Sequence, residues 1–315
     1  GALTVLLKDA INPNLVKTLE GTPAIVHGGP FANIAHGCNS IIGTKLALKL
    51  SDYVVTEAGF GADLGAEKFL DIKCRKAEIR PDAVVCVATI KAIKYHGGMP
   101  KEEIKNESIE YLKKGIHNLY KHIDNLKNVY GLNVIVAINK YTHDTTKEIE
   151  FLTEKLKEKN IELSLVESWE KGGEGAIDLA EKVIKLTQKD FEFNYAYKLN
   201  LTIKEKIETI AKKIYGADGV EYVEGIEEKI AEIERMGYGN LPICIAKTQY
   251  SLSDDQKNLE CNEPFNIHIQ DVILKAGAEF IVIIAGKIMT MPGLPKVPAA
   301  ESIDVDNNGN IVGIF

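Results

Sequence analysis

Two glycine-rich stretches of this chain contain the residue types that bind anionic ligands. The first, residues 22–40, begins with a short apolar run and continues into His27, Gly28, Gly29 and Pro30. Backbone amides that glycine leaves uncovered, next to the start of a helix, form a natural anion site. A tight turn in which glycine supplies an unusual backbone angle explains the same residues equally well. The residues by themselves leave both interpretations open.

The second glycine-rich stretch, residues 57–65, follows another apolar run. Its glycines at 59, 61 and 65 nearly match the dinucleotide-binding fingerprint, but the last glycine comes one residue too late. Glu57 and Asp63 are candidate polar contacts, although a solvated or helix-capping role is at least as good an interpretation of Asp63. The pattern indicates a loop that approaches a ligand closely, and it does not identify the ligand.

A third stretch, residues 87–98, ends an apolar run with two lysines and then a glycine pair. Lys91 and Lys94 are suited to contact a carboxylate or a phosphate. The residue types alone favour the simpler interpretation, in which both lysines are solvated.

Two further segments place aromatic residues directly after apolar runs. Tyr141 lies in residues 139–145, and Trp169, the only tryptophan of the chain, lies in residues 168–175 among glycines. If both segments follow strands of one sheet, an aromatic pair there could sandwich a flat ring system. Core packing is the alternative for Trp169, but a glycine-flanked loop is an unusual place for a core residue.

The elements that must position these residues follow from the apolar periodicity. Five short, continuously apolar runs alternate with helical patterns, which is typical of strands buried on both faces of a parallel sheet. The runs are residues 23–26, 52–56, 83–88, 133–138 and 162–166. Residues 104–125 repeat an apolar residue every three or four positions, which predicts a helix with one buried stripe. The alternation predicts an α/β fold with a mostly parallel sheet and flanking helices, whose functional groups gather at the carboxyl ends of the strands.

The pattern changes after residue 188, where a smaller α+β unit is predicted. Its expected helices and strands are residues 203–214, 223–236, 242–246, 265–274 and 280–285. Near the end, residues 304–309 imitate the first half of a calcium-binding loop. Phe315 stands where the acidic twelfth ligand is required, so a hairpin turn is the better interpretation.

The composition excludes several classes of protein. The chain has 315 residues, 45% hydrophobic and 26% charged, which suits a globular protein of two or three domains. A net charge of −7 argues against a nucleic-acid surface, and no apolar run approaches the roughly 20 residues of a membrane span. Five scattered cysteines without a CxxC, and histidines without zinc spacing, predict no metal site and reduced thiols in the cytoplasm. No Walker motif G-x-x-x-x-G-K-[ST] occurs.

Several of these stretches together resemble one enzyme family. Residues 87–98, VATIKAIKYHGG, closely follow that family's signature V-A-T-[IV]-R-[AS]-L-K-x-[HN]-G-G, with Lys91 in place of its arginine and Ile93 in place of its leucine. Further matches follow in order in residues 22–40, 57–69, 246–253 and 289–301. The chain therefore resembles formate–tetrahydrofolate ligase over residues 1–315, and several ordered motifs are far more specific than a single glycine loop.

The resemblance implies a reaction on formate, ATP and tetrahydrofolate. ATP with Mg²⁺ phosphorylates formate, formyl phosphate forms, and N10 of tetrahydrofolate attacks the formyl carbon to give 10-formyltetrahydrofolate. The resemblance also implies a homotetramer and brings a monovalent cation into consideration, without indicating which one. The lysine and arginine that stabilise the transferring phosphoryl group would lie in a Walker-loop segment that this sequence lacks. The catalytic residues of the present chain are therefore unknown.

The same resemblance assigns residues of this chain to the folate and formyl side of the site. Trp169 and Tyr141 would form an aromatic clamp for the pterin, with the adenine ring as competing occupant. Thr142 stands where the family usually has proline, and Leu165 would pack beside Trp169. The residues expected near formyl phosphate are Gly28, Gly29, Phe31, Ala32, His36 and Gly37. Glu57 and Lys91 complete the predicted contacts, and lysine in place of arginine argues against bidentate recognition at position 91.

The resemblance also suggests how the chain divides. Residues 1–120 are expected to complete a large α/β domain of the P-loop NTPase type that binds nucleotide and formyl phosphate. Residues 121–195 form a second α/β domain with the clamp, and residues 196–315 a C-terminal α+β domain. Gly1 leads directly into an apolar segment, so we expect a preceding segment with the Walker loop, without which this chain is inactive. The alternative is a non-catalytic ligand-binding or interaction fragment; a Rossmann-type dehydrogenase is disfavoured by the fingerprint spacing.

Overall fold

A computed structural model describes residues 1–261, 263–288, 290 and 295–313 of the chain. A parallel sheet of three strands forms its first layer, in the order β3 (Val84–Ala88), β4 (Val134–Asn139) and β5 (Leu163–Val166). The first five residues of the central strand β4 are buried, as expected of a strand covered on both faces. The α/β prediction with a parallel sheet is confirmed.

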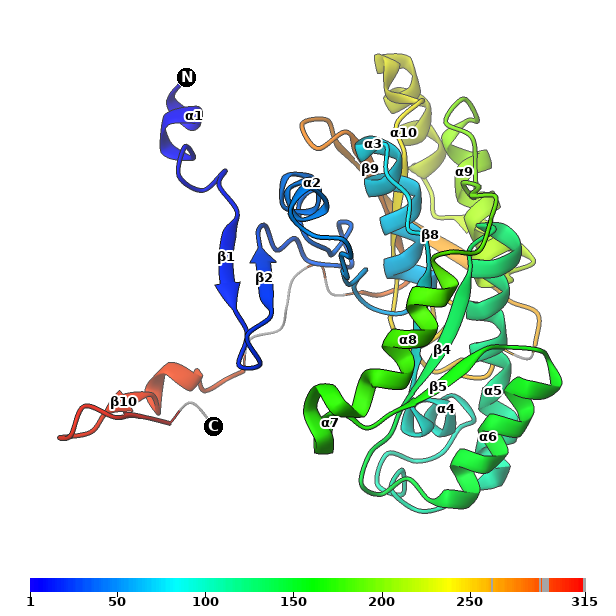
Figure 1. Cartoon of the computed structure of the whole chain (residues 1–315). Coiled ribbons are helices and arrows are strands. Elements are labelled where there is room, and N and C mark those ends of the chain that lie inside the picture. The colour runs from blue at the N-terminus through cyan, green and yellow to red at the C-terminus, as the bar shows by residue number, and fades with distance from the viewer. Residues whose placement is uncertain (262, 289, 291–294, 314–315) are drawn as a thin grey trace.

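Helices cover this sheet, with α8 on one side of the strands and α5 and α6 on the other in Figure 1. They are α4 (Ile90–His96), α5 (Ile109–Asp124), α6 (Thr146–Glu158), α7 (Ser168–Lys171) and α8 (Ile177–Leu186). The predicted apolar stripe of α5 is buried, and the helix begins where Ser108 accepts a hydrogen bond from the Tyr111 amide. A capping box of Thr145 and Glu148 begins α6.

A second, four-stranded sheet follows in the order β6-β8-β9-β7. Its strands are β6 (Gly219–Tyr222), β7 (Ile243–Ala246), β8 (Asn266–Lys275) and β9 (Phe280–Ala285), and its helices are α9 (Ile203–Ile210) and α10 (Ile226–Ile233). The pairs β6–β8 and β7–β9 are parallel, whereas β8 and β9 are antiparallel. Sequence reasoning predicted three of these strands and missed β6, because its four residues directly follow a turn and its partner β8 comes much later in the chain.

The largest apolar cluster joins the second sheet to a helical segment that precedes the first sheet. This segment runs over residues 62–77, as the π-helical turns Ala62–Ala66 and Phe69–Cys74 followed by α3 (Arg75–Ala77). Its Phe69 and Leu70 pack in one buried cluster with residues such as Ile207 and Ile283. The segment thereby holds the glycine-rich loops against the second sheet.

The first 60 residues do not form the arrangement of strands that the sequence predicted. They form α1 (Ala2–Leu6), β1 (Asn14–Lys17), β2 (Pro23–Val26) and α2 (Ile41–Leu50), and Figure 1 shows α1 and the β1–β2 hairpin set apart from the two sheets. The run 23–26 pairs antiparallel with β1 and does not join the parallel sheet. The run 52–56 forms no strand, and its Val55 is 93% exposed. The first correction arises because an apolar run indicates a strand but does not choose its partner. The second shows that a short apolar run does not have to form a strand.

A short hairpin of β10 (Asp304–Val305) and β11 (Ile311–Val312) follows near the carboxyl end. The Asp306 carboxylate accepts hydrogen bonds from the amides of Asn308 and Asn310, at 2.9 and 2.8 Å, which confirms the hairpin turn over a calcium loop. In the family-like stretch 289–301, residues 289 and 291–294 lie outside the described residues. None of the helices in the described part of the chain is long and apolar enough to cross a membrane.

Candidate functional site

The two aromatic segments meet at the carboxyl edge of the parallel sheet. Strands β4 and β5 end in register, with Asn139 opposite Val166, and the Lys140 amide donates to the Val166 carbonyl at 3.0 Å. A shallow hollow, open to solvent, lies between the two strand ends. Its lining residues are Lys140, Tyr141, Thr142, Glu167, Trp169 and Glu170. A depression along α6, lined only by residues between 150 and 158 of that helix, lacks such convergent groups.

Trp169 lies on α7 with its side chain 83% exposed. A core residue would be buried, so exposure removes core packing as an explanation of Trp169. Tyr141 on the opposite loop is 41% exposed. Leu165 points differently: it is half-buried in β5, packs against the apolar cluster beneath α5 and α6, and is not among the residues that line the hollow. The indole of Trp169 is therefore available to a planar ligand, whereas the Tyr141 ring also packs against the His143 ring, with centroids 5.8 Å apart. Leu165 supports the strand below them.

Hydrogen bonds and ion pairs fix the two loops of the hollow. Asp144 Oδ2 accepts from the Tyr141 amide at 2.8 Å, and the Asp144 amide donates to the Tyr141 carbonyl at 3.0 Å. Glu167 joins the loops, since its two oxygens lie 2.6 Å from Lys140 Nζ and 2.6 Å from Lys171 Nζ. These hydrogen bonds, from Lys140 first and then Lys171, lower the pKa of Glu167 to about 2. The carboxylate stays charged at neutral pH and keeps both lysines beside the hollow.

The β1–β2 hairpin also reaches this region. Glu20 Oε1 at the hairpin turn accepts a hydrogen bond of 2.9 Å from the Gly173 amide, directly after α7. Gly172 has a φ of +59°, and a Cβ on it would lie 2.6 Å from Glu20 Oε1. Glycine is therefore favoured at position 172 by its backbone angle, since the flexible end of the Glu20 side chain could move away from a Cβ.

The two glycine-rich loops lie against each other. Gly59 has a φ of +76°, and a Cβ there would lie 2.7 Å from the Gly37 carbonyl oxygen. The rings of Phe31 and Phe60 meet edge to face with centroids 6.1 Å apart. Gly28 has a φ of +68°, so the first loop does use glycine for an unusual backbone angle. This close packing forms a continuous surface from residues 28–37 and 57–61 that sequence reasoning treated as two separate candidates.

The two histidines of the first loop have different environments. His27 Nδ1 lies 2.7 Å from Ser40 Oγ and its Nε2 lies 2.9 Å from the Ala10 carbonyl oxygen, so His27 is a hydrogen-bonded packing residue, as its type suggested. His36 packs edge-on against Phe280, and its Nδ1 is buried without a hydrogen-bond partner in the described residues. Burial first, and then the charge of Lys73, lower the pKa of His36, which favours a neutral imidazole at pH 7.

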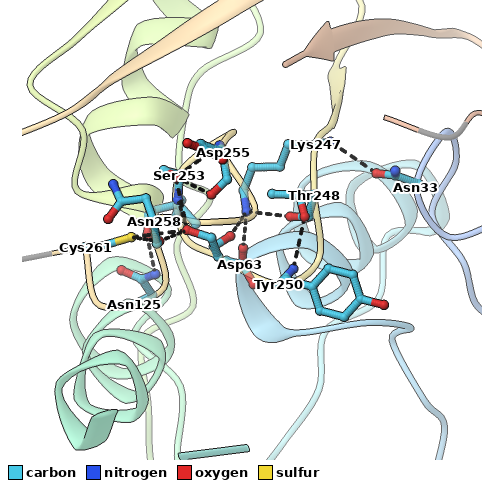
Figure 2. Close-up of polar contacts among 12 residues, drawn as sticks. Asn33, Asp63, Asn125, Lys247, Thr248, Tyr250, Ser253, Asp255, Asn258 and Cys261 are labelled. Carbon is cyan, nitrogen blue, oxygen red and sulfur yellow. Dashed lines mark hydrogen bonds and ion pairs between the residues drawn. The ribbon is translucent and has the colours of Figure 1, made fainter. Parts of the chain in front are cut away.

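Asp63 takes part in a buried ion pair that sequence reasoning missed (Figure 2). Lys247, directly after β7, places Nζ 2.7 Å from Asp63 Oδ2 and also donates to the carbonyls of Thr248 and Ser251. Burial, the largest single influence, opposes ionisation, but the charges of Lys247 and His122 and the hydrogen bonds to the carboxylate together lower the pKa of Asp63. The Lys247 amide donates to Asn33 Oδ1 at 3.2 Å. The solvated interpretation of Asp63 is wrong, and the pair joins both glycine-rich loops to the second sheet.

The remaining predicted contacts lie on exposed surface. Lys91 is exposed in the first turn of α4, which begins at Thr89, and Glu57 is exposed at the start of the second loop. Lys94, by contrast, is fully buried and contacts Glu148 Oε1 at 2.9 Å, so the prediction of two solvated lysines is wrong for Lys94. Within the described residues, no hydrogen bond, ion pair or ring contact joins Lys91 or Glu57 to the hollow.

The arrangement thus offers an exposed aromatic pair with a polar rim, and a separate surface of glycine-rich loops over a charged interior. In the part of the chain that the structure describes, no group of three or more His, Cys, Asp or Glu side chains could hold a metal ion.

A family model described as formate–tetrahydrofolate ligase matches residues 1–315. The chain belongs to the formate–tetrahydrofolate ligase family. That family joins formate to tetrahydrofolate with the use of ATP, so the resemblance noted from the motifs is confirmed.

In this member of the formate–tetrahydrofolate ligase family, sequence reasoning missed a set of buried lysines. Lys68, Lys73, Lys94 and Lys247 are all at most 1% exposed. One signal was present in the sequence: Lys68 and Lys73 lie in residues 62–77, whose neighbours are largely apolar. A lysine within such a helix must find acceptors inside the protein, because an unpaired buried ammonium is costly.

Proposed function

We propose that this chain supplies the folate and formyl side of a formate–tetrahydrofolate ligase site. In the reaction, a formate oxygen attacks the γ-phosphorus of ATP, and ADP leaves. N10 of tetrahydrofolate then attacks the carbon of formyl phosphate, the bond from that carbon to the phosphate oxygen breaks, and N10 loses its proton. The observation that carries the proposal is the hollow at the sheet edge, where Trp169 exposes 83% of its side chain opposite Tyr141.

The hollow suits a bicyclic pterin better than a purely apolar ligand. Its two aromatic side chains offer stacking surfaces, and its other lining groups are polar. Thr142 and Glu170 can hydrogen-bond the polar edge of a pterin, which presents both N–H groups and a carbonyl. The link from Lys140 to Glu167 holds the two loops at a fixed distance before the ligand arrives. Adenine remains the competing occupant, because it is also flat and polar-edged.

The loops 28–37 and 57–61 bind the formyl phosphate in this proposal, with backbone amides toward the anion. Gly28, Gly29 and Gly37 permit close approach, and in this proposal exposed Lys91, in the first turn of α4, and exposed Glu57, at the start of the second loop, contact the substrates. The triphosphate of ATP, with its Mg²⁺, would contact a Walker-type segment outside these 315 residues, since the sequence has no such motif. The described residues form no metal-binding group, so no step is assigned to Mg²⁺ or to a monovalent cation. We further propose a cytoplasmic homotetramer.

The proposal is tested by tetrahydrofolate binding. Trp169 is the only tryptophan, so its fluorescence reports on the hollow alone. We expect saturable quenching by tetrahydrofolate, competed only weakly by ATP if the pterin is the occupant. No change in Trp169 emission, together with no heat of binding in calorimetry, would overturn the proposal. The chain by itself should show no formate-dependent ATP turnover, and turnover by the single purified chain would show that the phosphate chemistry is misplaced.

A non-catalytic ligand-binding role is the second candidate. The two functions differ in what accompanies the chain. A catalytic role requires a co-purifying polypeptide with the Walker segment that restores formate-dependent turnover. An intact-mass spectrum with one 34.7 kDa species, and folate binding without turnover under any reconstitution, supports the non-catalytic role.

A further inference from the structure

Two fully buried lysines lie beneath the first glycine-rich loop. Lys68 is 0% exposed, and its Nζ donates to the carbonyl oxygens of Ala32 at 3.0 Å and Asn33 at 2.7 Å. Both acceptors belong to the loop, and Lys68 belongs to the helical segment 62–77. The ammonium group therefore holds the middle of the loop from its inner side.

The second lysine holds the end of the same loop. Lys73 is 1% exposed, and its Nζ donates to the Asn39 carbonyl at 2.7 Å and to Thr44 Oγ1 at 2.8 Å. Asn39 closes the loop and Thr44 lies in the first turn of α2. Two ammonium groups on one helical segment thus contact residues 32–44 at two separate places.

Neither ammonium has a carboxylate partner. Within the described residues, no Asp or Glu oxygen lies within 4.0 Å of Lys68 Nζ or Lys73 Nζ, whereas buried Lys94 and Lys247 each have one. The nearby Glu67 is buried too, its two oxygens have no hydrogen-bond partner in the described residues, and burial and then the Asp71 charge raise its pKa well above the ordinary value. Carbonyl and hydroxyl oxygens accept their hydrogen bonds but do not neutralise a positive charge, which therefore acts on the loop above.

The charge of Lys73 acts on the loop itself. Burial is the largest influence on the pKa of His36, and the Lys73 charge lowers that pKa further. At Cys38, burial raises the thiol pKa while Lys73 opposes the rise. Both residues lie in the loop, so the charge of Lys73 reaches the loop. This positive charge would stabilise an anion bound on the outer side of the loop.

We propose that Lys68 and Lys73 are positioning residues for a phosphate-type anion at residues 28–40. They fix the shape of the loop through its carbonyl groups, and their positive charge favours an anion that the loop binds. The inference rests on the proposed function, in which this loop binds an acyl phosphate, and it adds the residues that make the loop selective for anions. Neither lysine touches the ligand.

Inorganic phosphate is the probe, and calorimetric titration of the full chain measures its affinity. Lys68→Met and Lys73→Met remove one charge each with little change of volume. The matched control is Lys206→Met, because Lys206 is equally buried and donates to the carbonyls of Gly239 and Leu241 without a carboxylate within 4.0 Å. We expect the phosphate Kd to rise about tenfold in each of the first two variants, and to stay within about twofold in the control. Lys73→Arg should recover most of the affinity.

All three methionine variants lose a buried hydrogen-bonded group, so a purely structural role predicts equal losses of stability and no selective loss of phosphate affinity. Equal phosphate Kd values in the wild type, Lys68→Met and Lys73→Met would overturn the inference. So would equal weakening in all three variants. Weaker phosphate binding in Lys68→Met and Lys73→Met only, with similar thermal unfolding temperatures for all three variants, supports the inference.

A measurement on the unaltered chain covers the case in which a variant does not fold. With lysine labelled by ¹⁵N at Nζ, the buried ammonium groups give separate NMR signals. Phosphate should shift the signals of Lys68 and Lys73 and leave that of Lys206 unchanged; no shift at the first two overturns the inference. Tetrahydrofolate is titrated in parallel. A chain that binds folate but not phosphate contradicts this inference alone, and a chain that binds phosphate but not folate contradicts the proposed function alone.

Discussion

Replacement of Trp169 by alanine separates ligand stacking from folding more cleanly than any other change in this chain. Because 83% of the side chain is already exposed, Trp169→Ala removes little packing from the folded protein. We expect the free energy of unfolding to change by less than about 0.5 kcal/mol, as for other exposed positions. A change in ligand affinity can then be assigned to the lost contact with the ligand.

The magnitude follows from the exposed ring. Stacking contributes about 0.5–1.5 kcal/mol beyond burial, which is about 2- to 12-fold in Kd. One face of the indole covers roughly 100 Å², about half of the area that a tryptophan buries, and would add up to about 2.5 kcal/mol. Association converts only part of this area into affinity. We therefore expect the tetrahydrofolate Kd to rise roughly 10- to 100-fold.

Isothermal titration calorimetry measures this change, since the variant has no tryptophan fluorescence. Trp169→Phe keeps a ring and should lose only part of the affinity. Tyr53→Ala is the control, because Tyr53 is also an exposed aromatic residue, at 54%, and has no assigned contact. Unchanged folate affinity in Trp169→Ala, or an equal loss in Tyr53→Ala, would refute the clamp assignment.

Three further changes test the interior. Lys94→Met leaves the Glu148 carboxylate buried without a counter-charge, so the free energy of unfolding measured by urea denaturation should fall by about 3–5 kcal/mol. A fall of less than about 1 kcal/mol would contradict the ion-pair argument. Burial raises the pKa of Glu67, so the folded chain keeps a proton that the unfolded chain releases near pH 4.5. The free energy of unfolding should therefore fall as the pH rises above about 4.5 toward the folded pKa, and Glu67→Gln should flatten this fall in a pH series. Gly59→Ala places a Cβ 2.7 Å from the Gly37 carbonyl oxygen at a residue with positive φ, so the free energy of unfolding from thermal denaturation should fall by about 1–3 kcal/mol. Gly277→Ala, which has open space around the new Cβ, should leave it nearly unchanged.

The site was predictable to the extent that it depends on strand ends. Tyr141 and Trp169 follow two apolar runs, and parallel neighbours place their carboxyl ends at one edge. The same reasoning failed for residues 23–26, which pair with β1 outside the parallel sheet, and for residues 52–56, which form no strand. Apolar runs of this length carry no information about their partner, which is set by contacts distant in the sequence.

The sequence by itself determined the α/β alternation, the stripe of α5, the family and the aromatic residues at two strand ends, because periodicity and ordered motifs are local properties of the chain. Only the tertiary structure decided which charged residues are interior. Lys91 and Lys94 are three residues apart on one helix, yet one is exposed and the other fully buried. Whether a lysine is buried depends on whether residues distant in the sequence supply a hydrogen-bond acceptor for its ammonium group. Glu148 supplies one for Lys94, and loop carbonyls supply them for Lys68 and Lys73. That pairing exists only after the chain has folded, since no local pattern specifies the charge of a distant neighbour.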